Sequence, residues 1–177
     1  MAGAKGVDVQ TPSACVTRVD HQLRRPALPP DIHEGALEKA KAAGAEFTIN
    51  SQNIDPVEKI KEITSGGAHV GIDALGSEDT ASKSIMSLRR RGRHVQIGLL
   101  LPVDQNSRIP MQRALSYELD LFGSHGMSAM DYPKMLAMIS EGQLDPASLI
   151  ERTISLEEGA KELVLLDSAS ITGITVI

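Results

Sequence analysis

Two short segments, each with a glycine after an apolar run, carry the clearest chemical signal in this sequence. They are Ala74-Leu75-Gly76 and Ile97-Gly98-Leu99. Each follows β-branched and apolar residues, which is the composition of a buried strand. Because glycine has no Cβ, a flat ligand can lie directly against the backbone at these positions. Glycine after a strand also serves as a plain turn residue, and spacing alone leaves both interpretations open.

The residue types that most often bind metals show no metal-binding pattern. Cys15 is the single cysteine, which excludes an intrachain disulfide and a zinc site built from several cysteines. The five histidines have neither H-x-x-x-H spacing nor a neighbouring cysteine: His21, His33, His69, His94 and His125. We therefore predict no catalytic residue set and no metal site within these 177 residues.

The sequence around the first glycine segment predicts a strand followed by a helix. His69–Leu75 has the composition of a strand, and Ser77 suits a helix N-cap. Apolar residues then recur at helical spacing: Ala81, Ile85 and Leu88. Arginines at 89–91 would occupy the last turn, where the helix dipole favours cations, and Gly92 would end the helix.

A second strand is expected from Val95 to Leu99. So short a crossover between two apolar strands implies a parallel, right-handed β-α-β unit. Parallel sheets of this kind bind ligands at the carboxyl ends of their strands, which is where both glycine segments fall.

Periodicity and turn residues predict further elements along the chain. Helices are expected at 37–44, 56–63, 133–141 and 155–166, a turn at Met111–Ser116, and strands at 14–19, 47–50, 108–110, 117–123 and 171–177. Residues 1–30 contain several prolines that break any long periodicity, so we expect a poorly ordered leader before a domain at 31–177.

Composition excludes some classes of protein. A net charge of −5 provides no basic surface, and two Phe, two Tyr and no Trp leave little for base stacking, so nucleic acid is not an expected partner. No apolar run reaches the ~20 residues that span a bilayer, and the amino terminus lacks the apolar core of a signal peptide. We therefore expect a cytoplasmic protein without membrane contact.

Five phrases, in order along about four-fifths of the chain, carry a family resemblance: DIHEGALEKAKAAGA at 31–45, DPVEKIKEITSGG at 55–67, LRRRGRHVQIG at 88–98, ELDLFGSHG at 118–126 and RTISLEE at 152–158. The chain resembles the carboxyl-terminal part of the zinc-dependent, medium-chain alcohol dehydrogenases. The resemblance implies an α/β fold with a doubly wound parallel sheet of the Rossmann type, and NAD as cofactor. Intact relatives transfer hydride between an alcohol carbon and nicotinamide while zinc polarises the oxygen.

The resemblance also implies roles for individual residues. Asp31 matches the acid that accepts hydrogen bonds from the adenosine ribose, although a helix N-cap is the alternative; Ala36 stands where the family often has a lysine near that ribose. Ala74, Leu75 and Gly76 match a segment beside the nicotinamide, and Ile97, Gly98 and Leu99 match the segment whose backbone meets its carboxamide. Phe122 matches a third wall of that site, with plain core packing as the alternative.

The sequence departs from the family in two places. The G-x-G-x-x-G phosphate loop should lie about 20 residues before Asp31, and nothing there fits it. The zinc ligands of the family are absent as well. The expected fold is therefore an incomplete doubly wound sheet that lacks the first strand and the glycine-rich loop. A foreign leader that ends where the resemblance begins suggests a truncated or misassembled reading frame.

The loss of the first two strands leaves the expected third strand, 47–50, and fourth strand, 69–75, without the strands that join them. They must pair with each other, recruit Ala14–Val19, or keep open edges that favour association.

Two functions follow from the resemblance. The first is a truncated, NAD-dependent alcohol dehydrogenase that is inactive alone. The second is a non-catalytic remnant that binds nucleotide weakly or associates with full-length subunits. A short-chain dehydrogenase is disfavoured because neither Tyr117 nor Tyr132 has a lysine four residues on. By resemblance, a homodimer would form through an edge strand at Arg108–Met111.

Overall fold

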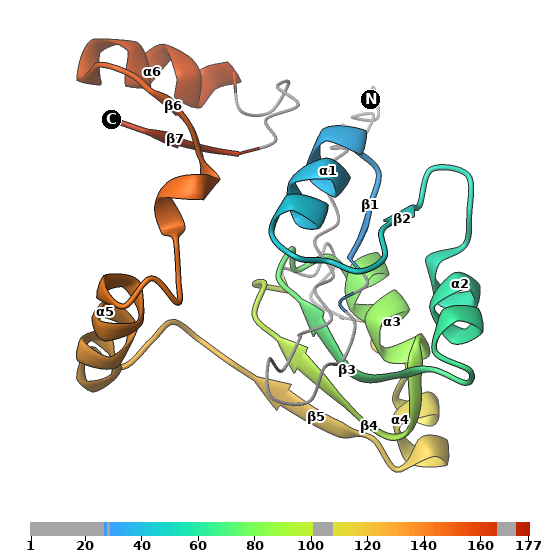
Figure 1. Ribbon diagram of the computed structural model, residues 1–177. Coiled ribbons are helices and arrows are strands. Elements are labelled where there is room, and N and C mark those ends of the chain that lie inside the picture. Colours follow the sequence, from blue (N-terminus) through green and yellow to red (C-terminus); the bar gives the residue numbers. More distant parts are fainter. Residues whose placement is uncertain (1–26, 28, 101–107, 166–172) are drawn as a thin grey trace, which may run out of the picture. The chain divides into compact units, whose positions relative to one another are not determined.

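The computed structural model describes residues 27, 29–100, 108–165 and 173–177. These residues fall into two compact units, one up to Gly126 and the other from Met127 to Ile177 (Figure 1). Within the described ranges, no helix is both long enough and apolar enough to cross a membrane.

The larger unit contains parallel strands joined by helices, which confirms the predicted α/β class (Figure 1). One sheet pairs β1 with β2, and the other has the order β3-β4-β5. The strands are β1 (Pro30–Asp31), β2 (Ile49–Asn50), β3 (Ala68–Asp73), β4 (Leu88–Gln96) and β5 (Asp120–Gly123). The helices are α1 (Glu34–Ala42), α2 (Pro56–Ile63), α3 (Glu78–Met86) and α4 (Met111–Tyr117).

Helix α2 begins as the sequence predicts. The Asp55 carboxylate accepts a hydrogen bond from the Val57 backbone N–H at 2.9 Å, and Pro56 occupies the first turn, where it needs no hydrogen-bond partner. The Val57 and Ile60 side chains are buried beneath the helix. The capping residue and the buried apolar face therefore both favour a helix at this place.

Helix α3 is also capped as predicted, because the Ser77 hydroxyl accepts from the Thr80 N–H at 3.1 Å. Ala81 and Ile85 are buried on one face of the helix. A small core joins both sheets through Ile49 of β2, Ile60 of α2, Ala68 of β3 and Leu88 of β4, with Ile63 and Leu119 packed against it.

The arginines at 89–91 do not lie in a helix, so that prediction is wrong. Helix α3 ends at Met86, and β4 already begins at Leu88, which is fully buried and pairs with Ala68. The pairing then jumps to Val70 with Arg93, so the three arginines form an irregular, exposed segment in which Arg91 has a φ of 56°. Burial of Leu88 outweighs the modest attraction between cations and the helix dipole.

The segment after residue 107 also differs from the prediction. Arg108–Pro110 has no regular secondary structure, and the expected turn at Met111–Ser116 is helix α4. This run is made of residues that favour helices, and Glu118, with a φ of 51°, ends it. The Arg113 guanidinium donates to the Leu88 carbonyl at 3.1 Å, which fixes α4 against β4, and strand β5 begins only at Asp120.

Among the described residues of the larger unit, the doubly wound sheet is divided into two separate sheets, β1-β2 and β3-β4-β5. Strands β2 and β1 correspond to the third and second strands, and β3, β4 and β5 to the fourth, fifth and sixth. The expectation that the second strand is wholly missing is wrong, because Pro30 and Asp31 pair with Ile49 and Asn50. The third and fourth strands do not pair with each other. The predicted strand at Ala14–Val19 lies outside the described residues.

The smaller unit contains a parallel pair of strands and two helices. In chain order its elements are η1 (Ala129–Asp131), α5 (Tyr132–Ser140), η2 (Pro146–Leu149), β6 (Ile150–Thr153), α6 (Leu156–Leu165) and β7 (Ile174–Val176). Both helices and the last strand were predicted. Strand β6 was not, because its sequence IERT lacks apolar alternation.

Candidate functional site

The two glycine segments lie directly against each other at the ends of β3 and β4. A Cβ built on Gly98 would stand 2.2 Å from the Gly76 nitrogen and 2.5 Å from the Leu75 carbonyl carbon. A Cβ on Gly76 would stand 2.5 Å from the Leu99 oxygen, and Gly76 has a φ of 88°. Mutual packing therefore requires glycine at both positions, which satisfies the turn interpretation, and both glycines stay partly exposed.

Asp73, the last residue of β3, organises this junction. Its side chain is fully buried, and Oδ1 accepts from the N–H groups of Leu75 at 3.1 Å and Gly76 at 3.3 Å. Its backbone oxygen accepts from the N–H groups of Ile97 at 2.8 Å and Gly98 at 2.9 Å. A single residue thus holds both glycine segments.

Gln96, the last residue of β4, closes the same junction from the other side. Its Nε2 donates to Asp73 Oδ2 at 2.7 Å and to the Gly98 carbonyl at 2.8 Å. Asp73 and Gln96 are also register partners in the β3–β4 pair. The side chains at the two strand ends therefore fix each other and the turn that follows.

A line of buried polar side chains continues from Gln96 into the unit. His94 Nε2 lies 3.0 Å from Gln96 Oε1, and His94 Nδ1 lies 3.0 Å from the Ser84 hydroxyl. Burial lowers the pKa of His94, while the hydrogen bond to Gln96 and the charge of Asp73 act in the opposite direction. A neutral ring with its proton on Nε2 satisfies both contacts, since it donates to Gln96 and accepts from Ser84.

Asp31 lies at the end of β1 and is buried. Its Oδ1 accepts from the His33 N–H at 2.8 Å, while its backbone oxygen accepts from Ser51. The N-cap of α1 is His33, so Asp31 is not the cap residue that the sequence left as an alternative. Asp31 belongs to the other sheet, and among the described residues no hydrogen bond joins it to the glycine segments.

Phe122 lies in β5 opposite Val95 and is half exposed, at 50%. The alternative of plain core packing for this side chain is therefore wrong. Ile97 and Leu99 are also exposed, at 52% and 68%. Ile97 and Leu99 belong to the glycine segment that follows β4, and Phe122 lies on the neighbouring strand β5.

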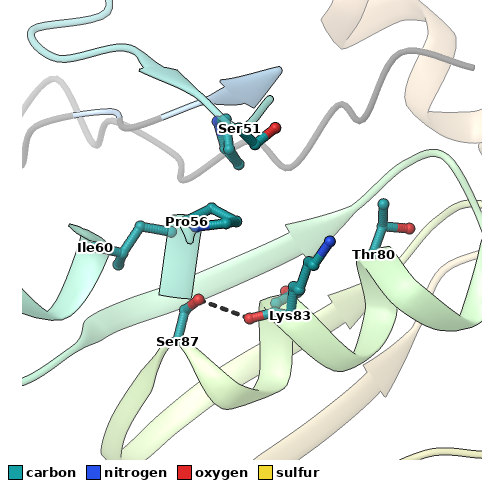
Figure 2. Close-up of a pocket in the computed structure, with 8 residues that line it drawn as sticks. Ser51, Pro56, Ile60, Thr80, Lys83 and Ser87 are labelled. Atoms are coloured by element: carbon teal, nitrogen blue, oxygen red, sulfur yellow. Dashed lines mark hydrogen bonds between the residues drawn. The ribbon is translucent and has the colours of Figure 1, made fainter. Parts of the chain in front are cut away.

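A small pocket shares Ser84 with the line of polar side chains and is not lined by the glycine segments. Its lining includes Ser51, Pro56 and Ile60 from the β2–α2 region, and Thr80, Lys83 and Ser87 from around α3 (Figure 2). Its volume of about 20 Å³ suits a single water molecule and not a nucleotide. The Ser87 hydroxyl donates to the Lys83 carbonyl at 2.6 Å beside it (Figure 2).

Within the described ranges, no group of three or more His, Cys, Asp or Glu side chains is placed to hold a metal ion. The described residues therefore do not fit a zinc site.

The family is established by sequence comparison. The sequence model of the zinc-binding dehydrogenase family matches residues 30–141, and the chain belongs to that family. An NAD-dependent alcohol dehydrogenase of Sulfurisphaera tokodaii is 32% identical over 144 residues, which are 81% of this chain and 40% of that protein. A sorbitol dehydrogenase of Halalkalibacterium halodurans is 26% identical over 71% of this chain and 36% of its own length.

Comparison of structures supports the same fold. Benzyl alcohol dehydrogenase from Acinetobacter calcoaceticus superposes with a TM-score of 0.72 at 23% identity, over 82% of this chain and 40% of that one. The chain thus spans about two-fifths of the length of the relatives that it matches.

The glycine junction lies beside the exposed side chains of Ile97 and Leu99, and the sequence contains no G-x-G-x-x-G loop. Sequence reasoning missed Asp73, Gln96 and Ser84, and it treated His94 as an ordinary histidine. The available signal was an aspartate inside an otherwise apolar strand, because buried acids are rare unless hydrogen-bonded.

Proposed function

We propose that this chain is an NAD-binding portion of a zinc-dependent alcohol dehydrogenase, which holds the adenosine ribose through Asp31 and the nicotinamide against the glycine junction. The glycine junction is the observation that carries this proposal, because it brings two partly exposed backbone segments together beside the exposed side chains of Ile97 and Leu99, against which a flat ring can lie. When bound, NAD supplies the hydride acceptor. The chain's own residues supply binding and orientation.

The expected affinity is low because the chain offers a ribose acid and two segments at the nicotinamide but no phosphate loop. We expect a dissociation constant in the millimolar range, about −4 kcal/mol. Titration with NAD, followed by NMR of backbone amides, measures this constant and locates the bound molecule. Signals at residues 31–34, 74–76 and 97–99 should move together.

Asp31→Ala tests the ribose contact, and it should weaken NAD binding at least threefold. Glu38→Ala is the matched control, since it removes the same charge from an exposed position in α1 and should leave binding unchanged. Micromolar binding that Asp31→Ala does not weaken would contradict both the affinity and the role of Asp31.

A second function, association with full-length family members, is favoured by the apolar surface of the smaller unit. A groove of about 300 Å³ is lined by Ile154, Gly159, Leu163 and Ile177 among others. Leu163 is 70% exposed and Val164 is 78% exposed. Co-purification with a co-expressed full-length relative should be abolished by Leu163→Glu and retained by Lys161→Glu, an exposed position on the same helix. Equal loss in both variants would reject the groove as the contact surface.

A further inference from the structure

Strand β4 leaves its regular pairing with β3 shortly after it begins. Leu88 pairs with Ala68 and Arg93 with Val70, so residues 89–92 stand opposite a single residue of β3. We call these four residues, Arg89-Arg90-Arg91-Gly92, the arginine bulge. A β-bulge bends its strand and changes the direction of its side chains, and bulges are common beside functional sites.

Close backbone packing fixes the shape of the arginine bulge. A Cβ built on Gly92 would stand 2.9 Å from the Arg89 oxygen, and one on Gly67 would stand 2.5 Å from the Arg89 nitrogen. Arg91 has a φ of 56°, a left-handed conformation that is strained for a residue other than glycine. The surrounding structure therefore holds the bulge in one conformation, and an arginine stands where glycine would be favoured.

The first two arginines of the bulge are held by ring-bearing side chains. Arg89 Nη1 donates to His69 Nε2 at 2.7 Å, and the Arg90 guanidinium lies over the Tyr117 ring, 5.1 Å from its centroid. The guanidinium of Arg113 lies over the same ring, 3.2 Å from the centroid. Positive charge therefore gathers around Tyr117, and stacking restricts the Arg90 side chain before any ligand binds.

Arg91 and Arg93 contact carboxylates through one nitrogen each. Arg91 Nε donates to Glu118 Oε2 at 3.1 Å, and Arg93 Nε donates to Asp120 Oδ2 at 3.2 Å. The two arginine side chains are nevertheless 81% and 64% exposed. Their terminal N–H groups are therefore accessible to a ligand.

The net charge of −5 conceals this concentration of positive charge. The contacts around the bulge join five arginines and two carboxylates: Arg89, Arg90, Arg91, Arg93, Arg113, Glu118 and Asp120. Composition predicted no basic surface, and that prediction is wrong at this place. Stability does not account for the cluster, because exposed ion pairs contribute little and neighbouring cations repel one another.

We propose that the arginine bulge, together with Arg93, is a binding site for an oligophosphate, a chain of two or more linked phosphate groups. A guanidinium presents a planar fork of N–H donors that matches phosphate oxygens. A chain is required because Glu118 and Asp120 repel a single small anion, whereas linked phosphates contact several arginines at once. The bulge lies near the start of β4 and the glycine junction follows its end, so this inference does not depend on the proposed function.

The test uses tripolyphosphate as the probe, and NMR of backbone amides locates it on the 177-residue chain. Signals at residues 89–93 and 117–120 should shift, whereas those at 74–76 and 97–99 should not. Orthophosphate should bind at least tenfold more weakly, since it reaches fewer arginines. Adenosine triphosphate separates two sources of the same chemistry: affinity equal to that of tripolyphosphate assigns the site to any oligophosphate, and affinity at least fivefold higher assigns it to a nucleotide.

Arg91→Gly removes one guanidinium and also relieves the left-handed φ, so its urea midpoint should stay near that of the wild type. Its affinity for tripolyphosphate should fall at least fivefold. Lys41→Gln is the control, because it removes the same charge from an exposed position in α1, and it should change the affinity less than twofold.

Glu118→Gln tests the site in the opposite direction, because it removes a carboxylate that repels the ligand and releases Arg91 Nε. The affinity for tripolyphosphate should rise at least twofold. Glu58→Gln, at an exposed carboxylate of α2, should leave it unchanged.

An affinity unchanged by Arg91→Gly, or lowered equally by Lys41→Gln, overturns the inference. Equal binding of orthophosphate and tripolyphosphate overturns it as well. A chain that binds NAD but not tripolyphosphate rejects this inference and leaves the proposed function standing, whereas the reverse result rejects only the proposed function.

Discussion

Gly98→Ala should destabilise the larger unit strongly, although the substitution adds only one methyl group. The new Cβ would lie 2.2 Å from the Gly76 nitrogen, whereas ordinary contacts begin at 3.4 Å, so the ends of β3 and β4 must separate by about 1 Å. Gly98 has no left-handed φ, so contact alone creates the cost. Overpacking of this kind costs about 1–3 kcal/mol, and a weakened Gln96 to Gly98 hydrogen bond adds about 1 kcal/mol.

We therefore expect the free energy of unfolding to fall by about 2–4 kcal/mol. Urea denaturation followed by circular dichroism should show this as a midpoint lowered by about 1–2 M. Gly123→Ala is the matched control, because Gly123 pairs with Gln96 on the other side of β4 and a Cβ there meets nothing within 4 Å. Its unfolding should change by less than about 0.5 kcal/mol. A Gly98→Ala midpoint equal to that of the wild type would refute the steric argument.

Three further predictions follow. The 177-residue chain by itself should not oxidise simple alcohols with added zinc, because its sequence has one cysteine and no H-x-x-x-H pair; activity that a chelator abolishes would contradict this. The chain should sediment as a dimer or larger species at micromolar concentration, because open sheet edges and exposed apolar side chains favour association; a single monomeric species would contradict this. Because burial lowers the pKa of His94, the folded state resists protonation of this ring, and unfolding free energy should decline as pH falls below 6.5. His94→Gln should remove part of that decline in urea titrations between pH 7.5 and 5.5, and an unchanged slope would show that other groups cause it.

The sequence predicted elements whose signals are local. Asp55-Pro56 and Ser77 predict where their helices begin, because a capping side chain bonds to backbone N–H groups only two or three residues further on. The end of α3 could not be predicted in this way, since burial of Leu88 against Ala68 decides it. The same limit applies to Arg108–Pro110, which the pattern along the chain predicted as a short strand and which has no regular secondary structure.

The same distinction between local signals and contacts made by tertiary packing applies to the candidate site. The two glycine segments were predicted as places of close approach, and the partners that approach each other proved to be the segments themselves. The Gln96 amide donates to Asp73 across the two strands, and His94 Nε2 bonds to Gln96 Oε1 along β4. No spacing rule specifies the bond to Asp73, because it depends on the register of β3 against β4.

Strand pairing in this chain has a consequence for the order of folding. Every pair within the described residues joins strands that are neighbours along the chain: β1 with β2, β3 with β4, β4 with β5, and β6 with β7. Pairing between neighbours along the chain favours rapid folding. As the polypeptide leaves the ribosome, strands can pair in chain order, and the core that Ile49 shares with Ala68 and Leu88 forms once β4 has emerged.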